Sequence, residues 1–285
     1  MSKEPNSSKI TNILSEAESK LKQTSGTPRL DAEILLAKVL DTSRFGLLTM
    51  YRGTVDAKQR QLFESFVARR MKFEPVAYIT NEKEFFEDTF FVDDRVLVPR
   101  PESEFTVEEA VLALKTTKKS KVLDICCGSG CIGFSIKRVT DCALTLSDIS
   151  ENALDVAKIN ATRLFPDKND IVFIQSDLFE NISGKFDLIT ANPPYLSRKD
   201  MKNFVVRELS FEPENAFYGG DEGFEITEKI IKSAGGFLKR GGIFITELGY
   251  EGADFIKEKM FGLKLVKTIK DYSEITRAAV FQKQD

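Results

Sequence analysis

The sequence predicts an α/β protein that begins with a small helical domain, and three observations support this prediction. Apolar residues recur at helical spacing from residue 10 to about residue 73. Runs rich in phenylalanine between residues 85 and 98 then predict a β-hairpin. From about Glu104 onward, short apolar runs alternate with amphipathic stretches, as in a sheet covered by helices. We therefore expect a helical domain over residues 1–80, a hairpin linker over 81–103 and an α/β domain over 104–285.

Two apolar stripes predict how the helical domain packs. One stripe consists of Leu30, Ile34, Leu35 and Val39, and the other of Leu62, Phe63, Phe66 and Val67. Each stripe has the spacing of one helix face, so we expect both to face a common core. In the hairpin, we expect a turn at residues 87–89 and a second strand that continues from Phe90 to Val98.

Seven strands are expected in the α/β domain. They are the apolar runs near residues 121–125, 143–148, 171–175, 186–191, 242–247, 263–268 and 277–282. Helices are expected between the first five strands, whereas the last two strands follow each other without a helix. In sheets of this kind, ligands bind beyond the carboxyl ends of the strands. Residues that directly follow a strand are therefore the candidate site residues.

The four residues Asn192, Pro193, Pro194 and Tyr195 directly follow the predicted strand 186–191. Proline has no backbone N–H and a φ held near about −65°, so two prolines in succession stiffen the loop and leave its carbonyl oxygens as acceptors. Together with the Asn192 side-chain oxygen, these acceptors suit a planar NH2 group of an amide or an aromatic amine. The Tyr195 ring offers a flat surface for packing. An ordinary Pro-Pro turn is the alternative interpretation.

The segment Lys121–Gly133 predicts a nucleotide site made of a strand, a turn of small residues and a helix. Gly128 and Gly130 allow a tight turn and a close approach of the backbone to a ligand. The N–H groups at the start of the following helix point to the same place. Because residues 128–133 also match GxGxxG, with Asp148 at the end of the next strand, a dinucleotide is one possible ligand.

Acidic residues at three strand ends favour S-adenosylmethionine over NAD as the ligand. Asp124 precedes the turn, where a carboxylate would repel a pyrophosphate but attract the amino group of methionine. Asp148 suits the ribose hydroxyls of either cofactor. Asp177 suits the adenine amino group, and Leu178 and Phe179 can pack on the adenine ring. One such acid is more often a loop cap, but three at successive strand ends indicate a ligand site.

The composition excludes several classes of protein. The 285 residues contain no histidine, which removes hydrolases with Ser-His-Asp or Cys-His sites. The four cysteines, Cys126, Cys127, Cys131 and Cys142, form no CxxC pair, so we expect buried thiols and no metal. A net charge of −3 argues against non-specific binding of nucleic acid. The polar start and the lack of a long apolar run predict neither a secretion signal nor an anchor, and hence a cytoplasmic protein.

Several motifs of the chain are similar to those of a known family. Residues 124–130 and 192–195 resemble the motifs of class I methyltransferases that modify amino nitrogens. Further segments, which extend the resemblance over almost the whole chain, are Leu30–Leu36, Glu74–Ile79, Val96–Glu104, Phe211–Pro213 and Asp271–Glu274 with Arg277. The chain thus resembles the PrmC/HemK family of peptide chain release factor N5-glutamine methyltransferases. Cys126 stands where this family has the first glycine of its turn.

The resemblance implies a Rossmann-like class I methyltransferase fold whose last strand inserts antiparallel into a seven-stranded sheet. It implies methyl transfer from S-adenosyl-L-methionine to the side-chain amide of the glutamine in the Gly-Gly-Gln motif of release factors. The helical domain over 1–80 would recognise the release factor, and we expect a monomer without nucleic acid or membrane contact. The implied cofactor-binding residues are Asp124, Cys126, Cys127, Gly128, Ser129, Gly130, Asp148, Asp177, Leu178 and Asn192. The implied catalytic and substrate-binding residues are Asn192, Pro193, Pro194 and Tyr195.

The chemistry of this reaction depends on positioning, because an amide nitrogen is a poor nucleophile and no base is placed to deprotonate it. If Asn192 Oδ1 and the Pro193 carbonyl each accept one N–H, the nitrogen is held about 3–3.5 Å from the methyl group and in line with it. Arg100, between two prolines, either lies on the surface, closes over the cofactor or touches the partner. Glu247 either faces the site or caps Gly249.

Three alternative functions remain open at this point. A ribosomal-protein glutamine methyltransferase shares the cysteine-rich turn. A nucleic-acid amino methyltransferase would use the same loop on a flipped base, but the acidic net charge counts against it. A non-catalytic Rossmann module would keep the glycine turn without needing residues 192–195. The segments 30–33 and 271–277 favour the release factor enzyme.

Overall fold

The structure is a computed structural model, and it describes residues 8–116, 119–167, 170–203, 207–249, 252–257 and 261–284. The chain divides into two compact units. The first unit contains residues 1–82 together with 207–211, and the second contains 83–206 and 212–285. Within the described residues, no helix is long and apolar enough to cross a membrane.

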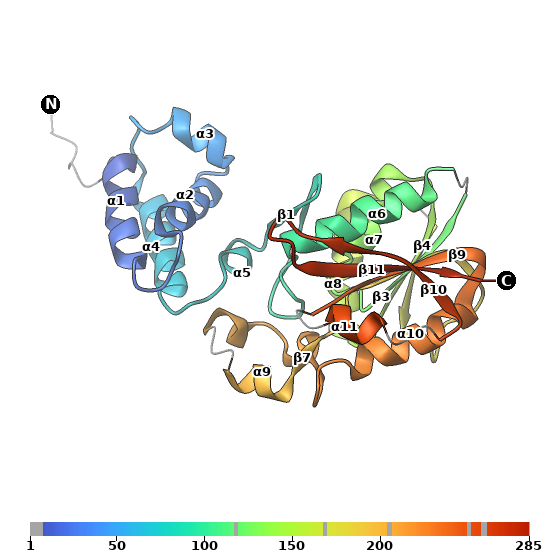
Figure 1. Ribbon diagram of the computed structural model, residues 1–285. Coiled ribbons are helices and arrows are strands. Elements are labelled where there is room, and N and C mark those ends of the chain that lie inside the picture. The colour runs from blue at the N-terminus through green and yellow to red at the C-terminus, as the bar shows by residue number, and fades with distance from the viewer. Residues whose placement is uncertain are drawn as a thin grey trace, which may run out of the picture. The chain divides into compact units, whose positions relative to one another are not determined.

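The first unit is helical, as the sequence predicts. Its helices are α1 (Ile10–Leu21), α2 (Pro28–Val39), α3 (Arg44–Thr49), α4 (Ala57–Arg70) and α5 (Val76–Thr80) (Figure 1). Pro28 starts α2, where its missing N–H costs no hydrogen bond, and Asp56 forms a capping box with Gln59 at the start of α4. The segment η3 (Arg207–Phe211) belongs to this unit, and the Arg207 guanidinium lies 4.8 Å from the centre of the Phe73 ring.

The apolar core of the first unit confirms most of the two expected stripes. Leu35, Phe63 and Val67 are buried in this core, and Phe66 packs partly against it. Leu30 and Ile34 are half-buried and lie outside this core, whereas Leu36 is fully buried in it. Leu62 is also an exception, because its side chain is 46% exposed. The reason is that α4 is polar around most of its circumference, so that only a narrow line of its surface faces the core.

The predicted hairpin exists, but it is shorter than expected. Strands β1 (Lys83–Phe85) and β2 (Asp88–Phe90) pair antiparallel, with Phe85 opposite Asp88. The turn is therefore Phe86-Glu87 rather than residues 87–89, and Phe86 adopts the left-handed conformation at φ 54°. The expected strand up to Val98 is wrong, since residues 91–100 form a loop. Phe85 and Phe90 pack edge to face and are buried in the core of the second unit.

The second unit is built on one sheet, which contains all seven expected strands. They are β3 (Lys121–Ile125), β4 (Ala143–Asp148), β5 (Ile171–Gln175), β6 (Phe186–Ala191), β9 (Leu238–Glu247), β10 (Leu263–Lys270) and β11 (Thr276–Lys283). Their order is β10-β11-β9-β6-β3-β4-β5. Strand β11 lies antiparallel between β9 and β10, as the family resemblance implies. The pairs β3–β4, β3–β6, β4–β5 and β6–β9 are parallel.

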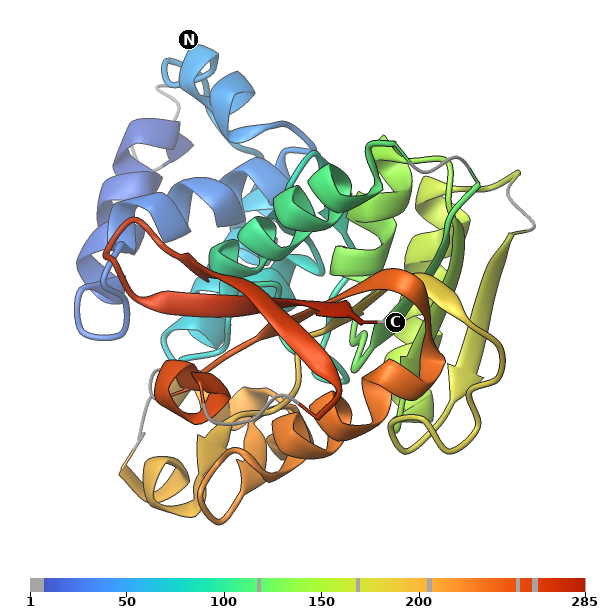
Figure 2. The same ribbon diagram turned by 45° about the vertical axis from the view of Figure 1, so that its right-hand side comes forward.

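Helices cover both faces of this sheet (Figures 1 and 2). Helices α6 (Glu104–Leu114), α7 (Cys131–Val139) and α8 (Glu151–Leu164) pack on one face, and α10 (Glu225–Phe237) and α11 (Gly252–Lys257) on the other. Side chains of β3 alternate between the two layers: Val122 joins the core with α7, whereas Leu123 and Ile125 join the core with α10. Burial on both faces explains why the strands read as continuous apolar runs.

One expected helix is wrong, because the connection from β5 to β6 consists of turns and loop. Side chains hold the backbone there: Ser176 Oγ accepts the Asn181 N–H at 3.0 Å, and Asn181 Nδ2 donates to the Gln175 carbonyl at 2.9 Å. The remaining short elements of the unit are η2 (Pro101–Ser103), β7 (Leu196–Ser197), α9 (Arg198–Asn203), η4 (Glu214–Ala216) and β8 (Tyr218–Gly220).

Candidate functional site

A cavity of about 290 Å³ opens in the second unit, beside the residues that follow β3, β4, β5 and β6. This is where open α/β sheets bind their ligands. Of the predicted cofactor and substrate residues, those that line the cavity are Cys126, Cys127, Gly128, Ser129, Asp148, Asp177, Leu178, Asn192 and Pro194, whereas Asp124, Gly130, Pro193 and Tyr195 do not. Further lining residues come from residues 95–103, from 213–218 and from the apolar side chains of Ile125, Ile132, Ile149 and Ile226.

The turn after β3 needs glycine at its last position. Gly130 has φ 80°, and a Cβ there would lie 2.4 Å from the Phe134 ring. The Gly130 N–H donates to the Cys127 carbonyl at 2.8 Å, and the Cys127 N–H donates to the Ser147 carbonyl at 3.1 Å. These bonds close the turn and tie it to β4. The backbone beside the cavity is therefore held in place before any ligand binds.

Cys126 adopts the left-handed conformation, with φ 57°. This conformation explains the glycine that the family has at this position, since a Cβ costs about 1–2 kcal/mol in that region. Burial raises the pKa of the Cys126 and Cys127 thiols well above the usual range, and it raises that of Cys131 to about 12. These thiols are therefore protonated at neutral pH and act in packing.

Asp124 is buried behind the turn and does not line the cavity. Its carboxylate accepts from the Thr190 hydroxyl at 2.8 Å and from the Gly133 N–H at 3.1 Å. Burial raises its pKa to about 7, although these two hydrogen bonds favour the charged form. Asp124 shares a sheet face with Val122, so its side chain is directed at α7, and it links the end of β3 to the start of that helix.

Asp148 and Asp177 both line the cavity, at the ends of adjacent strands. Asp148 accepts the Gly128 N–H and the Ser150 N–H, each at 2.9 Å. Burial raises the Asp148 pKa, and the two backbone donors oppose that rise. Leu178 lines the cavity next to Asp177. Phe179 does not face a ligand as expected, because its ring is buried and stacks on Phe237 with centroids 4.6 Å apart.

The loop 192–195 begins at the cavity. Asn192 and Pro194 line it, whereas Pro193 is buried and Tyr195 is half-buried outside the lining. The Asn192 Nδ2 group lies 3.4 Å from Ser103 Oγ. The Tyr195 ring faces Gly249, where a Cβ would come within 3.0 Å of a ring carbon. Burial, followed by the nearby Glu247 carboxylate, raises the Tyr195 pKa. No local signal in the sequence indicates that Ser103 lies beside this loop.

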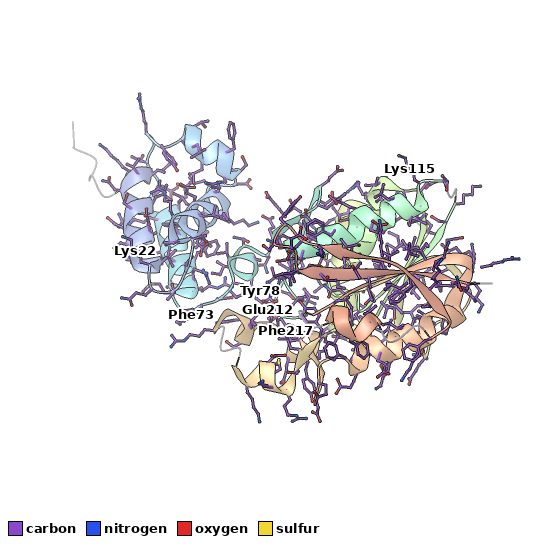
Figure 3. The ribbon with its side chains drawn as sticks, in the orientation of Figure 1. Lys22, Phe73, Tyr78, Lys115, Glu212 and Phe217 are labelled. Carbon is purple, nitrogen blue, oxygen red and sulfur yellow. The ribbon has the colours of Figure 1, made fainter. Side chains whose placement is uncertain are left out.

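Two loops that are distant in sequence complete the cavity. Val96, Leu97, Pro99 and Arg100 contribute from one, and Pro213, Asn215 and Ala216 from the other. Glu212 joins them, since it accepts the Val98 N–H at 2.9 Å and the Arg100 guanidinium at 2.6 Å. Figure 3 labels Glu212 and Phe217, which come directly before and after residues 213–216 in the sequence. The prolines beside Arg100 and Glu212 are the sequence signal for these stiff segments.

Asn160 supports the site from α8, and the sequence did not single it out. It is fully buried, and its Oδ1 accepts the Phe91 N–H at 2.7 Å. Its Nδ2 donates to the carbonyls of Phe91 and Ser129, both at 3.0 Å. One side chain thus joins the loop that follows the hairpin to the glycine turn. Because every polar atom of this buried side chain is hydrogen-bonded, Asn160 fixes the position of the loop relative to the glycine turn.

The lining residues fit S-adenosylmethionine. The carboxylates of Asp148 and Asp177 can accept from ribose hydroxyls and from an adenine amino group, and Ile149 and Leu178 add apolar surface beside them. The turn at 126–130 brings backbone close to the same space. The groups that the cofactor needs are therefore gathered on one cavity, even though they come from different strand ends.

The fold and the cavity define the chain as a class I methyltransferase. Among solved structures, it is similar to the ribosomal protein L11 methylase of Lactobacillus delbrueckii subsp. bulgaricus, with a TM-score of 0.50, 16% identity and coverage of 71% of this chain and 89% of that chain. A methyltransferase from Pyrococcus furiosus has the same TM-score of 0.50, with 20% identity and coverage of 69% and 89%. At such identities the likeness concerns the fold alone.

Sequence comparison is more specific. The PrmC N-terminal domain matches residues 12–80, and the methyltransferase small domain matches residues 108–220. The release factor glutamine methyltransferase of Leptospira interrogans is 39% identical over 73% of this chain and 75% of its own length. That of Buchnera aphidicola subsp. Baizongia pistaciae is 34% identical over 97% of this chain and 100% of its own length. The chain belongs to the release factor glutamine methyltransferase family.

Proposed function

We infer that this chain transfers a methyl group from S-adenosylmethionine to the side-chain amide nitrogen of the glutamine in the Gly-Gly-Gln motif of a release factor. This inference depends on one observation: Asn192 lines the same cavity as residues 126–129 of the turn. Membership of the family supports the substrate.

The cofactor supplies an electrophilic methyl group on a sulfonium centre when it is bound. Asp148 would accept from the ribose hydroxyls, and Asp177 would accept from the adenine amino group beside Leu178. Asp124 lies behind the turn, so we assign it an indirect role: it holds the start of α7 through the Gly133 N–H. Residues 126–129, which line the cavity, would hold the methionine part.

Asn192 and Pro193 would hold the acceptor amide. The Asn192 Oδ1 and the Pro193 carbonyl would each accept one N–H of the glutamine and so hold its amide nitrogen toward the methyl donor. A planar NH2 group has two donors, so two acceptors satisfy it completely. Tyr195 lies outside the cavity lining, so we assign it to holding the loop against Gly249. Once methylated, the nitrogen would be acidic and would lose one N–H proton to water.

We also propose that the helical domain over 1–80 recognises the release factor, because one glutamine side chain offers too little surface to select a protein. A chain that begins at Lys83 would then bind the cofactor and fail on intact release factor. A start at Glu104 would be too late, since Phe85 and Phe90 belong to the core and residues 95–103 line the cavity. We propose a cytoplasmic monomer without nucleic acid contact, consistent with the net charge of −3.

Asn192→Ala tests the proposed function. The substitution removes one acceptor and leaves Pro193 in place, so turnover of release factor should fall on the order of a hundredfold. Cofactor affinity, measured by calorimetry, should stay close to that of the unchanged chain. Asn152→Ala, at an exposed position on α8, is the matched control and should keep full activity.

Labelled S-adenosylmethionine and mass spectrometry of the product locate the methyl group. Release factor, a ribosomal protein and nucleic acid are offered in parallel reactions. Methylation of either of the last two, with the Gly-Gly-Gln glutamine untouched, would contradict the proposal, as would full turnover by Asn192→Ala.

A further inference from the structure

Ser103 lies between two groups that end adjacent strands. Asn192 Nδ2 is 3.4 Å from Ser103 Oγ. Burial raises the pKa of the Glu247 carboxyl, and the Ser103 hydroxyl, acting as a hydrogen-bond donor, lowers it. Ser103 is 2% exposed and Glu247 is 7% exposed, so bulk water does not replace these contacts. The second Glu247 oxygen, Oε1, is buried without a hydrogen-bond partner in the described structure.

The sheet register explains why the three residues meet. Strands β6 and β9 pair in parallel with Ala191 opposite Thr246, so Asn192 and Glu247 leave the sheet side by side. Ser103 is the last residue of η2, which follows the stiff Pro99-Arg100-Pro101 segment. The arrangement therefore brings two strand ends together with a residue of the Val96–Glu104 motif.

We propose that Ser103 and Glu247 are positioning residues, which determine that the oxygen of the Asn192 amide, and not its nitrogen, faces the methyl acceptor. A carboxylate only accepts hydrogen bonds, so Ser103 must use its single proton toward Glu247. Ser103 Oγ is then an acceptor toward Asn192, and it selects Nδ2. The Oδ1 atom is left for the glutamine N–H. This inference rests on the proposed function and extends it to the residues behind Asn192.

The charge of Glu247 determines which groups donate and which accept between Glu247, Ser103 and Asn192. A protonated carboxyl can donate to Ser103, which frees the hydroxyl to donate to Asn192 Oδ1 and removes the preference. Burial raises the Glu247 pKa to about 8, Asp124 and Glu102 add to the rise, and the Ser103 hydroxyl and Arg277 oppose it. Burial raises the pKa of Tyr195, and the negative charge of Glu247 in turn adds to this rise. A cationic sulfonium compound in the cavity would favour the carboxylate.

A double-substitution experiment tests whether Ser103 acts through Asn192. Ser103→Ala should lower kcat for release factor on the order of tenfold. This loss is smaller than the roughly hundredfold loss in rate that follows when a reacting group is misplaced by about 1 Å. The cofactor affinity and the melting temperature of this variant should change little. In a chain that already carries Asn192→Ala, the added Ser103→Ala should have no further effect on kcat, because there is no amide left to orient.

Ser183→Ala, at an exposed position between β5 and β6, is the control and should leave all values unchanged. Losses that multiply in the double variant would overturn the inference, as would unchanged turnover in Ser103→Ala. An unchanged chain that fails to methylate release factor would instead overturn the proposed function, so the two failures are distinguishable.

The pH dependence gives a second, independent test that does not need Ser103→Ala to fold. The kcat/KM of the unchanged enzyme should rise between pH 6 and pH 9 as Glu247 ionises, since this profile reports groups of the free enzyme. Glu247→Gln keeps the size of the side chain and removes the titration, so this rise should disappear. The same rise in both proteins would contradict the assignment of Glu247.

Discussion

Arg100 and Glu212 form a 2.6 Å ion pair, although 112 residues separate them in the sequence. The Glu212 side chain is 2% exposed, whereas Arg100 is 35% exposed. The second Glu212 oxygen accepts the Val98 N–H. One buried carboxylate therefore joins two loops that both line the cavity. Arg100 therefore contributes to the cavity wall and is paired there with Glu212. Its contact with the cofactor or with the partner stays a prediction.

Glu212→Gln should weaken cofactor binding and leave the fold intact. The amide oxygen can still accept from Val98, but the charge that pairs with Arg100 is lost, and hydrogen bonds between charged groups contribute about 1.5–3 kcal/mol. Calorimetry should show a lower affinity for S-adenosylmethionine, by on the order of tenfold. Asp155→Asn, in the exposed pair with Lys158, is the control and should change nothing measurable. Equal affinities in both variants would mean that the pair does not shape the cavity.

Cys126→Gly should stabilise the protein. Cys126 has a positive φ, and glycine removes a Cβ cost of about 1–2 kcal/mol, less the entropy that glycine loses on folding. The melting temperature should therefore rise by a few degrees, with cofactor binding retained. Cys127→Gly is the contrasting variant, because Cys127 is buried and is not among the residues with positive φ. That variant should melt at a lower temperature, and a loss of equal size in both would refute the strain argument.

Asp148→Ala should reduce affinity for S-adenosylmethionine by an amount on the order of 1.5–3 kcal/mol, the range for a hydrogen bond to a charged group. Asp148 also accepts the Gly128 and Ser150 N–H groups, so Asp148→Asn is needed beside it. The Asp148→Asn variant keeps one acceptor oxygen. In a calorimetric titration, its affinity for S-adenosylmethionine should therefore lie between those of Asp148→Ala and the unchanged protein. Unchanged binding by Asp148→Ala, or tighter binding of NAD than of S-adenosylmethionine, would contradict the cofactor site.

The stability of the free protein should fall as the pH rises from about 5 to about 8. Burial raises the pKa of Asp124 to about 7 and that of Glu247 to about 8 in the folded state. Between pH 5 and 8 the folded protein therefore holds protons that the unfolded chain has already released, and each increase in pH favours unfolding. Urea unfolding at several pH values measures this slope.

Glu247→Gln should reduce the slope, since it removes one of the two groups that titrate. Glu180→Gln, at an exposed position in the same unit, should leave the slope as it is. A free energy of unfolding that rises with pH over this range in the unchanged protein would show that these carboxyl groups are ionised throughout.

The two acidic residues of the Leu30–Leu36 motif form buried ion pairs that the motif itself does not indicate. Asp31 and Glu33 are 5% exposed, and both are paired within the first unit. Arg70 donates to Asp31 at 2.7 Å, and Arg29, Arg44 and Tyr51 donate to Glu33 at 2.8, 2.9 and 2.6 Å. Burial acts to raise the Glu33 pKa, but these three donors hold it at about 2. The family signature at this place is therefore part of the core of the helical domain.

The sequence by itself determined the seven strands, the glycine turn and the loop 192–195. Strands that are buried on both faces read as apolar runs, and turns need residues of particular backbone freedom, so both leave local signals. The tertiary structure decided what meets across long separations: Glu212 with Arg100, Asn160 with the glycine turn, and Ser103 between Asn192 and Glu247. It also directed Asp124 to α7 and Phe179 to Phe237. Such partners depend on the order and register of the strands. Local patterns in the sequence do not reveal either of these.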